Sequence, residues 1–307
     1  MGILVTGGAG FIGSHIVDAL AEKGGRNNEI IVIDDLSNGN AKNINKKSKL
    51  IRKNLARDDI AGELAGIQSV FHFAADPEVK ASADLPAHGF ENNAVATFRL
   101  LEQCRKADVK RFVFASTSTV YGDAETIPTP ETATPMPISN YGASKLACEA
   151  YCSSYAHCYG IKTTVLRYAN IFGERSMHGV MHDFFQKLKR DADKLEILGD
   201  GRQEKSYLHV SDCVVATLLA YEKQTRLFDV FNIGSKERHA VDTIAQGVCK
   251  ILNVTPKLTH TNSERGWVGD VKLMQLDVGK IKALGWKEKI SFGEGVKRYV
   301  AWLLTGG

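Results

Sequence analysis

The chain has 307 residues, of which 44% are hydrophobic and 24% are charged, and its formal net charge at neutral pH is +4. This length allows one large domain or two closely joined ones, and the composition is typical of a globular enzyme. No dense basic arm with interleaved aromatic residues is present, which argues against a nucleic-acid partner. We expect no leader segment at Met1 and no membrane partner, because no apolar run is long enough to span a bilayer.

The cysteines give no sign of a metal or redox site. Six occur, at positions 104, 148, 152, 158, 213 and 249, and none forms a CxxC pair or a Cys/His spacing of the kind that binds zinc. We therefore expect no metal, buried free thiols, and a reducing, cytoplasmic location. The lysine-rich stretch 42–49 is expected to be a solvated loop.

A glycine-rich turn joins the first predicted strand to the first predicted helix. Residues 3–5 are aliphatic, and apolar residues recur at helical spacing over 12–20. Gly7, Gly10 and Gly13 permit a tight turn, a close backbone approach and close helix packing. The N–H groups at the helix start, around Phe11 and Ile12, would then face a pyrophosphate. Glycines at a turn of this kind in any α/β protein are the alternative.

An acidic residue follows the second predicted strand. Residues 29–33 are mostly apolar and end in Asp34, 21 residues after Gly13. A carboxylate at this point can accept both hydroxyls of an adenosine ribose and would repel a 2′-phosphate, which favours NAD over NADP. Asp35 and Asn38 follow as further candidates for contact with the cofactor, although both also fit a plain turn.

Further strand-like runs occur at 49–53, 69–73, 111–116 and 162–167, with helical stretches between most of them. This alternation predicts an α/β fold with a parallel sheet that has helices on both faces, and ligands bind at the carboxyl ends of such strands. Ala74 and Ala75 follow one strand end and would let a cofactor approach the backbone. His72 is predicted to be a core histidine, and Asn93 can either cap a helix or hydrogen-bond the cofactor.

Hydroxyl and basic residues provide the candidate chemistry. Residues 116–119 are all serine or threonine and follow a strand, where they could merely satisfy a turn. Tyr141 and Lys145 are four residues apart in a predicted helix, so their side chains leave on one face. We expect Lys145 and a positively charged nicotinamide to lower the pKa of Tyr141 from its usual value near 10. The phenolate could then take a proton from a hydroxyl of the substrate.

In this order the motifs resemble the extended short-chain dehydrogenase/reductase family, and within it the UDP-sugar 4-epimerases. The match covers about residues 2–286 and rests on TGGAGFIG (6–13), Asp34, FAA (73–75), Asn93, STSTVYG (116–122), Tyr141 with Lys145, RYAN (167–170) and LGW (284–286). The resemblance implies a Rossmann doubly wound parallel sheet, formed by 1–170 plus about 205–236. It also implies a smaller, mainly helical C-terminal substrate-binding domain, formed by 171–204 plus 237–307 and interleaved with the first.

The resemblance also assigns individual residues. Those implied to contact NAD are Asn54 and Leu55 beside the adenine, and Phe73, Ala74, Ala75, Asn93, Ser116, Tyr141, Lys145 and Tyr168. Those implied to contact the substrate are Thr117, Ser118, Tyr141, Asn170, Lys205, Tyr207, Arg265 and Asp270, with Thr117, Tyr141 and Lys145 catalytic. Lys205 stands where the family usually has arginine, and Arg265 precedes Asp270 by five residues instead of three, so we expect an altered pyrophosphate clamp. A core tyrosine at 207 and a surface ion pair at 265 are the alternatives.

The activity implied by the resemblance is NAD-dependent epimerisation at C4 of a UDP-hexose, UDP-galactose to UDP-glucose, through a transient 4-keto intermediate. Related 4,6-dehydratases and decarboxylases place acidic residues near the catalytic threonine, whereas Ser118 and Thr119 stand here, which favours epimerisation. A net dehydrogenase or a non-catalytic NAD-binding protein would also fit parts of this pattern. The resemblance further implies a homodimer through the helices at 92–106 and 140–159, unless their apolar residues face only the sheet. Met274 falls near the position that limits the C2 substituent, so N-acetyl sugars stay open.

Overall fold

A seven-stranded parallel sheet forms the larger part of the molecule in the computed structural model, which describes residues 2–23, 29–261, 263 and 265–306. The strand order is β10-β6-β5-β4-β1-β2-β3, and every neighbouring pair is parallel. The bounds are β1 (Gly2–Thr6), β2 (Ile30–Ile33), β3 (Ser48–Ile51), β4 (Ile67–His72), β5 (Arg111–Thr117), β6 (Lys162–Tyr168) and β10 (Phe228–Ile233). The predicted doubly wound parallel sheet is confirmed. Its order reverses between β1 and β4, where such sheets open a crevice for ligands.

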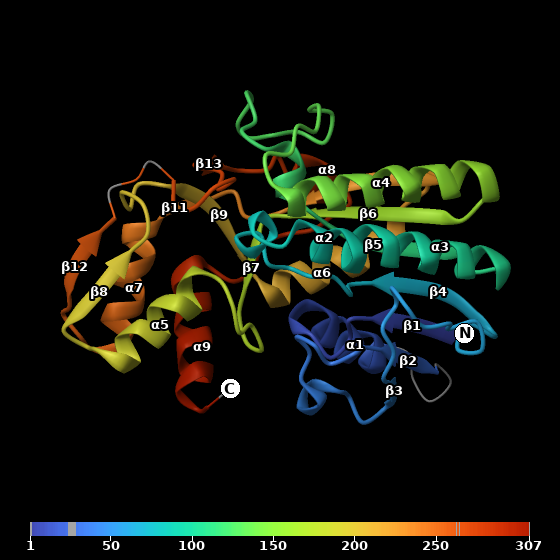
Figure 1. Ribbon diagram of the computed structural model, residues 1–307, viewed down its shortest axis with the longest axis horizontal. Coiled ribbons are helices and arrows are strands. Elements are labelled where there is room, and N and C mark those ends of the chain that lie inside the picture. The colour runs from blue at the N-terminus through green and yellow to red at the C-terminus, as the bar shows by residue number, and fades with distance from the viewer. Residues whose placement is uncertain (1, 24–28, 262, 264, 307) are drawn as a thin grey trace.

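Helices cover both faces of this sheet (Figure 1). On one face lie α1 (Phe11–Lys23) and α6 (Val210–Lys223), and on the other α3 (Ala96–Lys106) and α4 (Asn140–Tyr159). Side chains such as Ile16 and Cys213 belong to the core of the first face, and Leu100 and Cys152 to that of the second. Because both faces are buried, β2 is apolar along its whole length (IIVI), and its four residues are all buried.

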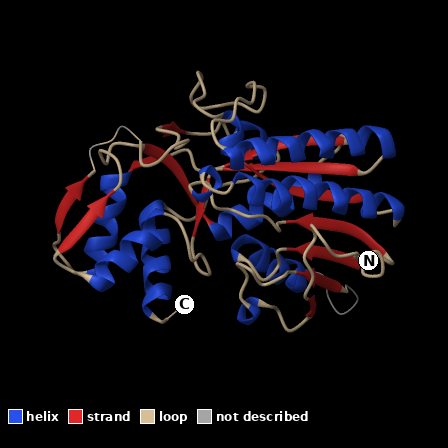
Figure 2. Ribbon diagram, viewed as in Figure 1, coloured by secondary structure: helices blue, strands red, loops and turns tan. Residues whose placement is uncertain are grey.

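The smaller part contains more strand than the sequence indicates (Figure 2). The helices α5 (Val180–Arg190), α7 (Val241–Leu252) and α9 (Phe292–Leu304) share a core with two small sheets. One sheet joins β7 (Asn170–Phe172), β9 (Glu204–His209), β11 (Arg238–Ala240) and β13 (Leu273–Met274), and the other joins β8 (Lys194–Ile197) and β12 (Lys257–His260). The remaining short helices are α2 (Pro86–Gly89), α8 (Gly279–Ala283), η2 (Ala41–Asn43), η3 (Ala81–Ala83), η4 (Phe90–Val95) and η5 (Ser118–Tyr121). The expectation of a mainly helical part is corrected to a mixed one, because all of its strands except β9 have only two to four residues and are too short to show a period.

The chain crosses between the two parts more than once. β9 pairs with the strands of the smaller sheet, whereas α6 packs on the main sheet and β10 joins its edge. The chain thus returns to the main sheet at β10, whose neighbour is β6. The exact division into interleaved domains, 1–170 plus about 205–236 against the rest, stays a prediction.

His72 lies at the end of β4 and is buried, which confirms it as a core histidine. Its Nδ1 is 2.6 Å from Thr6 Oγ1 and its Nε2 is 2.9 Å from Thr97 Oγ1, so both ring nitrogens have partners. Burial lowers the pKa of His72 to about 3, and the nearby charge of Lys145 adds to this shift. The ring is therefore neutral at physiological pH.

The cysteines are all unpaired, and only Cys158 is exposed. Within the described ranges, no three His, Cys, Asp or Glu side chains are grouped so that they could hold a metal ion. In the same part of the chain, no helix is long and apolar enough to cross a membrane.

The turn after β1 depends on the missing side chain of Gly7. This residue has a φ of +68°, and a Cβ there would lie 2.5 Å from the backbone nitrogen of Ala74. A Cβ on Gly13 would lie 2.2 Å from the carbonyl oxygen of Gly7. The start of α1 and the end of β4 can therefore approach the turn this closely only with glycine at both positions.

We predict that Gly7→Ala destabilises the protein by roughly 2–3 kcal/mol, because it combines an unfavourable φ with a backbone clash. Denaturant unfolding would measure the change. Gly247→Ala in α7 is the matched control, since no atom lies within 4 Å of its Cβ position. That control should be neutral or stabilising by about 0.5–1 kcal/mol. An unfolding midpoint for Gly7→Ala equal to that of wild type would contradict the prediction.

Candidate functional site

A large cavity lies at the carboxyl ends of the parallel strands and extends to the smaller part. Its volume is about 1360 Å³, whereas a pocket for one small ligand is typically about 300–1,000 Å³. The predicted residues that line it are Gly7, Gly10, Phe11, Ile12, Gly13, Asp34, Asp35, Asn38, Asn54, Leu55, Phe73, Ala74, Ala75, Ser116, Thr117, Ser118, Tyr141, Lys145, Tyr168, Asn170, Lys205, Tyr207 and Asp270. Asn93 and Arg265 are not among its lining residues. The cavity has room for a dinucleotide together with a second ligand.

The glycine turn has the shape of a cradle for a pyrophosphate. A Cβ on Gly10 would meet only the carbonyl oxygen of Gly7, at 3.2 Å. The space next to Gly10 is otherwise open. α1 begins at Phe11, directly after this opening, and the N–H groups of its first turn have no intrahelical acceptors. A helix start of this kind binds anionic groups, so the residues present fit the pyrophosphate of NAD.

Asp34 is held at the cavity wall by two backbone donors. Its Oδ2 accepts a hydrogen bond from Ala9 N at 2.9 Å, and its Oδ1 accepts one from Leu36 N at 2.9 Å. Burial raises the pKa of this carboxyl, and the two hydrogen bonds oppose the shift. The carboxylate thus joins the end of β2 to the glycine turn and lies where an adenosine ribose would be bound.

Asp35 is tied to neighbouring loops. Its Oδ1 accepts from Ser37 N at 2.9 Å and its Oδ2 from Asn54 Nδ2 at 2.8 Å. Burial raises the pKa of Asp35, but hydrogen bonds from Ser37 and Asn54 outweigh it and the net shift is downward. These contacts are those of a turn residue, and a contact with the cofactor stays a prediction.

Asn93 lies behind the cavity, in the π-helical segment η4. Its amide nitrogen donates to Asp76 O at 3.2 Å and to Ser144 Oγ at 3.0 Å, and its amide oxygen accepts from Asp76 N at 2.8 Å. The side chain therefore ties the loop after β4 to α4, and it forms no cap hydrogen bond. Its contact with the cofactor stays a prediction.

Thr117 and Tyr141 face the same cavity from different elements. Thr117 ends β5 and caps η5, where its Oγ1 accepts a hydrogen bond from Thr119 N at 3.1 Å. Tyr141 lies in the first turn of α4, a helix capped by the hydroxyl of Ser139. Burial raises the pKa of the Tyr141 phenol, and the hydroxyl of Thr117 opposes this shift.

Lys145 lies one turn further along α4 and is 3% exposed. Its ammonium is 4.6 Å from the ring centroid of Phe114, and it donates no hydrogen bond to any described residue. Burial lowers its pKa. Lys145 is not one of the groups that shift the pKa of Tyr141. In the protein without NAD, this lysine therefore does not lower the pKa of the phenol.

The cations expected at the substrate pyrophosphate are both paired with carboxylates. Lys205 Nζ lies 2.5 Å from Asp270 Oδ1 and 5.1 Å from the ring centroid of Trp267. Arg265 Nη2 lies 2.6 Å from Asp123 Oδ2, in the loop that follows η5. The ion pair weighed as the alternative for Arg265 is thus present, and its role at a phosphate stays a prediction.

Sequence reasoning missed several cavity residues, among them Lys80, His178 and Trp267. Trp267 lies in the sequence between two predicted site residues, Arg265 and Asp270, and this position could have identified it as a cavity residue. Lys80 and His178 lie in loops without a motif, where the sequence carries no signal. Burial lowers the pKa of His178, while the charge of Glu78 opposes this shift.

This fold and site define an NAD-binding Rossmann enzyme whose cavity is lined by a tyrosine, a lysine and a threonine, Tyr141, Lys145 and Thr117. Residues 3–234 match the model of the NAD dependent epimerase/dehydratase family, and the chain belongs to that family. A crystal structure of a UDP-galactose 4-epimerase is 43% identical, with a TM-score of 0.89 over 100% of this chain and 99% of the other. The UDP-glucose 4-epimerase of Thermotoga maritima with UDP-glucose is 37% identical (TM-score 0.91, 100% and 99% covered). The Thermus thermophilus UDP-glucose 4-epimerase in complex with NAD is 33% identical (TM-score 0.90, 100% of both chains).

We predict that Asp34→Asn weakens NAD binding about 10- to 100-fold, because it removes the charge and leaves one oxygen for the Ala9 and Leu36 donors and the ribose. Equilibrium binding of NAD to the cofactor-free protein would measure it. Asp35→Asn is the matched control and should change the affinity much less. Equal affinities of both variants and wild type would show that Asp34 does not bind the ribose.

Proposed function

We propose that the protein interconverts UDP-galactose and UDP-glucose by epimerisation at C4, with NAD as a resident cofactor. The observation that carries this proposal is the placement of Thr117, Tyr141 and Lys145 in one cavity, between the glycine turn and the segment with Lys205 and Asp270. A cavity of this size admits a nucleotide sugar beside the cofactor. Similarity to 4-epimerases over the full length of the chain supports the same activity.

In the proposed mechanism, Tyr141 exchanges a proton with the C4 hydroxyl of the sugar while Thr117 hydrogen-bonds the same oxygen. NAD, when bound, supplies the oxidation of C4 and its later reduction. Since burial holds the pKa of the free phenol above its usual value, Tyr141 is neutral until a positive charge comes close. The buried ammonium of Lys145 provides hydrogen-bond donors for ribose hydroxyls at this point.

A 4,6-dehydratase or a decarboxylase is the second candidate. Those reactions require a base for a second proton or stabilisation of an elimination, and Ser118 and Thr119 supply no carboxylate next to Thr117. A 4-epimerase needs only the phenol and the hydroxyl. A net dehydrogenase, the third candidate, differs in leaving the cofactor reduced after each turnover.

We predict that the purified protein converts UDP-galactose into UDP-glucose over many turnovers without accumulating NADH. Tyr141→Phe should lower kcat at least about 100-fold while the bound NAD is retained, because only the proton-transfer group is lost. Chromatography of the nucleotide sugars and of the released cofactor would measure both. A 4-keto-6-deoxy product would point to a dehydratase, and stoichiometric NADH to a dehydrogenase. Near-normal activity of Tyr141→Phe would rule out the phenol as the base.

We also propose that the protein is a homodimer that pairs through α3 and α4. Three aromatic side chains stand on their outer face, namely Phe98 (41% exposed), Tyr151 (45%) and Tyr159 (52%). The rings of Phe98 and Tyr151 are 5.2 Å apart, and Arg105 covers the ring of Tyr159. A contiguous aromatic surface of this kind favours burial against a partner.

We also propose a cytoplasmic location, which the unpaired thiols support.

We predict that Phe98→Glu converts the dimer to monomer, because it places a charge in the apolar interface. Light scattering after gel filtration would measure the mass. Leu227→Glu is the control, since Leu227 is also 41% exposed but lies in the loop before β10. The interface would be wrongly placed if Phe98→Glu and Leu227→Glu had the same mass as wild type.

A further inference from the structure

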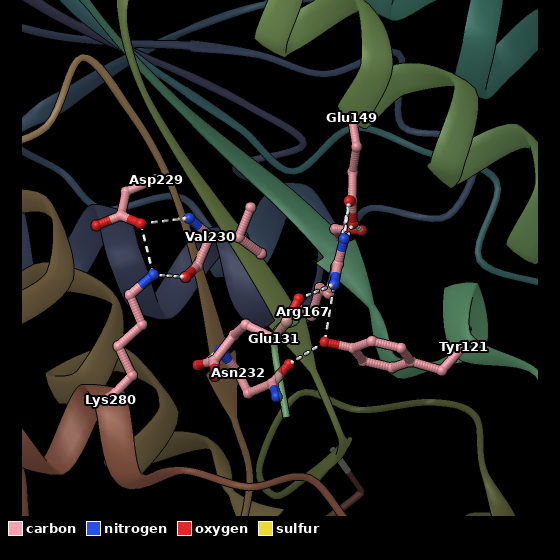
Figure 3. Close-up of polar contacts among 9 residues, drawn as sticks. Tyr121, Glu131, Glu149, Arg167, Asp229, Val230, Asn232 and Lys280 are labelled. Atoms are coloured by element: carbon pink, nitrogen blue, oxygen red, sulfur yellow. Dashed lines mark hydrogen bonds and ion pairs between the residues drawn. The ribbon is translucent and has the colours of Figure 1, made fainter. Parts of the chain in front are cut away.

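A continuous polar network lies in the core, between strands of the main sheet and α4 (Figure 3). Its members are Ser116, Glu149, Arg167, Tyr121 and Asn232, and none is more than 6% exposed. They come from β5, α4, β6, η5 and β10. Buried polar groups are costly unless they are satisfied, so a network of this length in the core indicates a specific task.

An ion pair between Arg167 and Glu149 forms the centre of the network. Arg167 Nη2 donates to Glu149 Oε2 at 2.6 Å and Arg167 Nε donates to Glu149 Oε1 at 3.0 Å, so the ion pair is bidentate. The hydroxyl of Ser116 also donates to Glu149 Oε1. The carboxylate of α4 is thus bound to the residue that immediately precedes Thr117 in β5.

The other side of Arg167 reaches η5. Arg167 Nη1 donates to the Tyr121 hydroxyl at 2.8 Å, and this hydroxyl donates to Asn232 Oδ1 at 2.8 Å. Asn232 Nδ2 in turn donates to the carbonyl oxygens of Thr129 and Asp277, at 2.9 and 3.1 Å. All polar atoms of the Asn232 side chain are therefore used, and they anchor this end of the network to β10.

The network holds the segment around Thr117 from both sides. Ser116 precedes Thr117, and Tyr121 ends the short helix that Thr117 caps. Glu149 lies four residues after Lys145 and eight after Tyr141, on the same face of α4. A shift of β5 against α4 would therefore break contacts that no solvent molecule replaces.

We propose that Glu149, Arg167 and Tyr121 are positioning residues that keep the hydroxyl of Thr117 in register with the phenol of Tyr141. They touch neither the cavity nor a ligand within it, since none of the three lines it. This inference rests on the proposed roles of Tyr141 and Thr117. Because proton transfer depends steeply on geometry, a displacement of about 1 Å lowers the rate strongly without removing a reacting group.

Tyr121→Phe is the sharpest test, because it removes one hydroxyl and leaves the ion pair in place. We expect kcat to fall about tenfold, with the NAD content unchanged and the KM for the UDP-sugar within about twofold. The hydroxyl of Thr117 lowers the pKa of Tyr141, so a misplaced Thr117 raises that pKa. The rising limb of kcat against pH should therefore move to higher pH. Glu149→Gln should show the same signature more strongly if it folds.

Tyr221→Phe provides a matched control at the opposite end of the sheet. The Tyr221 hydroxyl is 2.8 Å from Ser69 Oγ and an arginine, Arg111, lies over its ring, as Arg167 lies over the ring of Tyr121. Tyr221→Phe should lose about as much thermal stability as Tyr121→Phe, but it should keep the kcat and the pH profile of wild type.

The proposal would be overturned if Tyr121→Phe kept kcat and the pH profile of wild type. A fall in kcat with an unmoved pH limb, or with loss of NAD, would also overturn it, because both indicate a general structural role. Failure of the catalytic assignment is a separate result, since it would appear as activity in Tyr141→Phe.

Discussion

The close backbone contact between the glycine turn and the end of β4 is the constraint on which the site depends. Gly7 lies so near to Phe73 and Ala74 that any side chain would separate β1 from β4. The hydrogen bond from Ala9 to Asp34 joins the end of β2 to the same turn. Three strand ends thus meet where the strand order reverses, and the crevice for the dinucleotide follows from that meeting.

The residues proposed to react, Thr117 and Tyr141, are positioned by a different set of contacts. Thr117 belongs to a strand end and Tyr141 to a helix, and between them the chain forms the short helix η5 and a loop. The two are brought together by the packing of α4 on β5 and β6 and by the polar network between these elements (Figure 3). The glycine turn and the pair proposed to react are therefore fixed by different parts of the same sheet. β9 and the segment that ends at Asp270 line the part of the cavity where we propose that the substrate binds.

Local patterns in the sequence were sufficient for the sheet, for the glycine turn and for the cavity positions of Thr117, Tyr141 and Lys145. Features that depend on distant contacts were not accessible in this way. The ion pair of Arg265 joins residues 142 positions apart, and Asn93 is occupied by Asp76 and Ser144. In the protein without NAD, burial raises the pKa of Tyr141, an effect that only the folded chain defines, and the expected lowering by the nicotinamide charge together with Lys145 stays a prediction. Short strands such as β11 and β13 left no period to detect.

The buried ring of His72 has a consequence for the behaviour of the fold in acid. An unfolded chain binds a proton at this imidazole below about pH 6.5, whereas the folded chain resists protonation down to about 3. The contribution of His72 to stability is therefore complete above the unfolded value and declines as the pH falls from there towards the folded one. Protonation would also place two donors against the hydroxyls of Thr6 and Thr97, next to the ammonium of Lys145. Acid thus weakens the buried contacts of His72 that join β4 to β1 and α3.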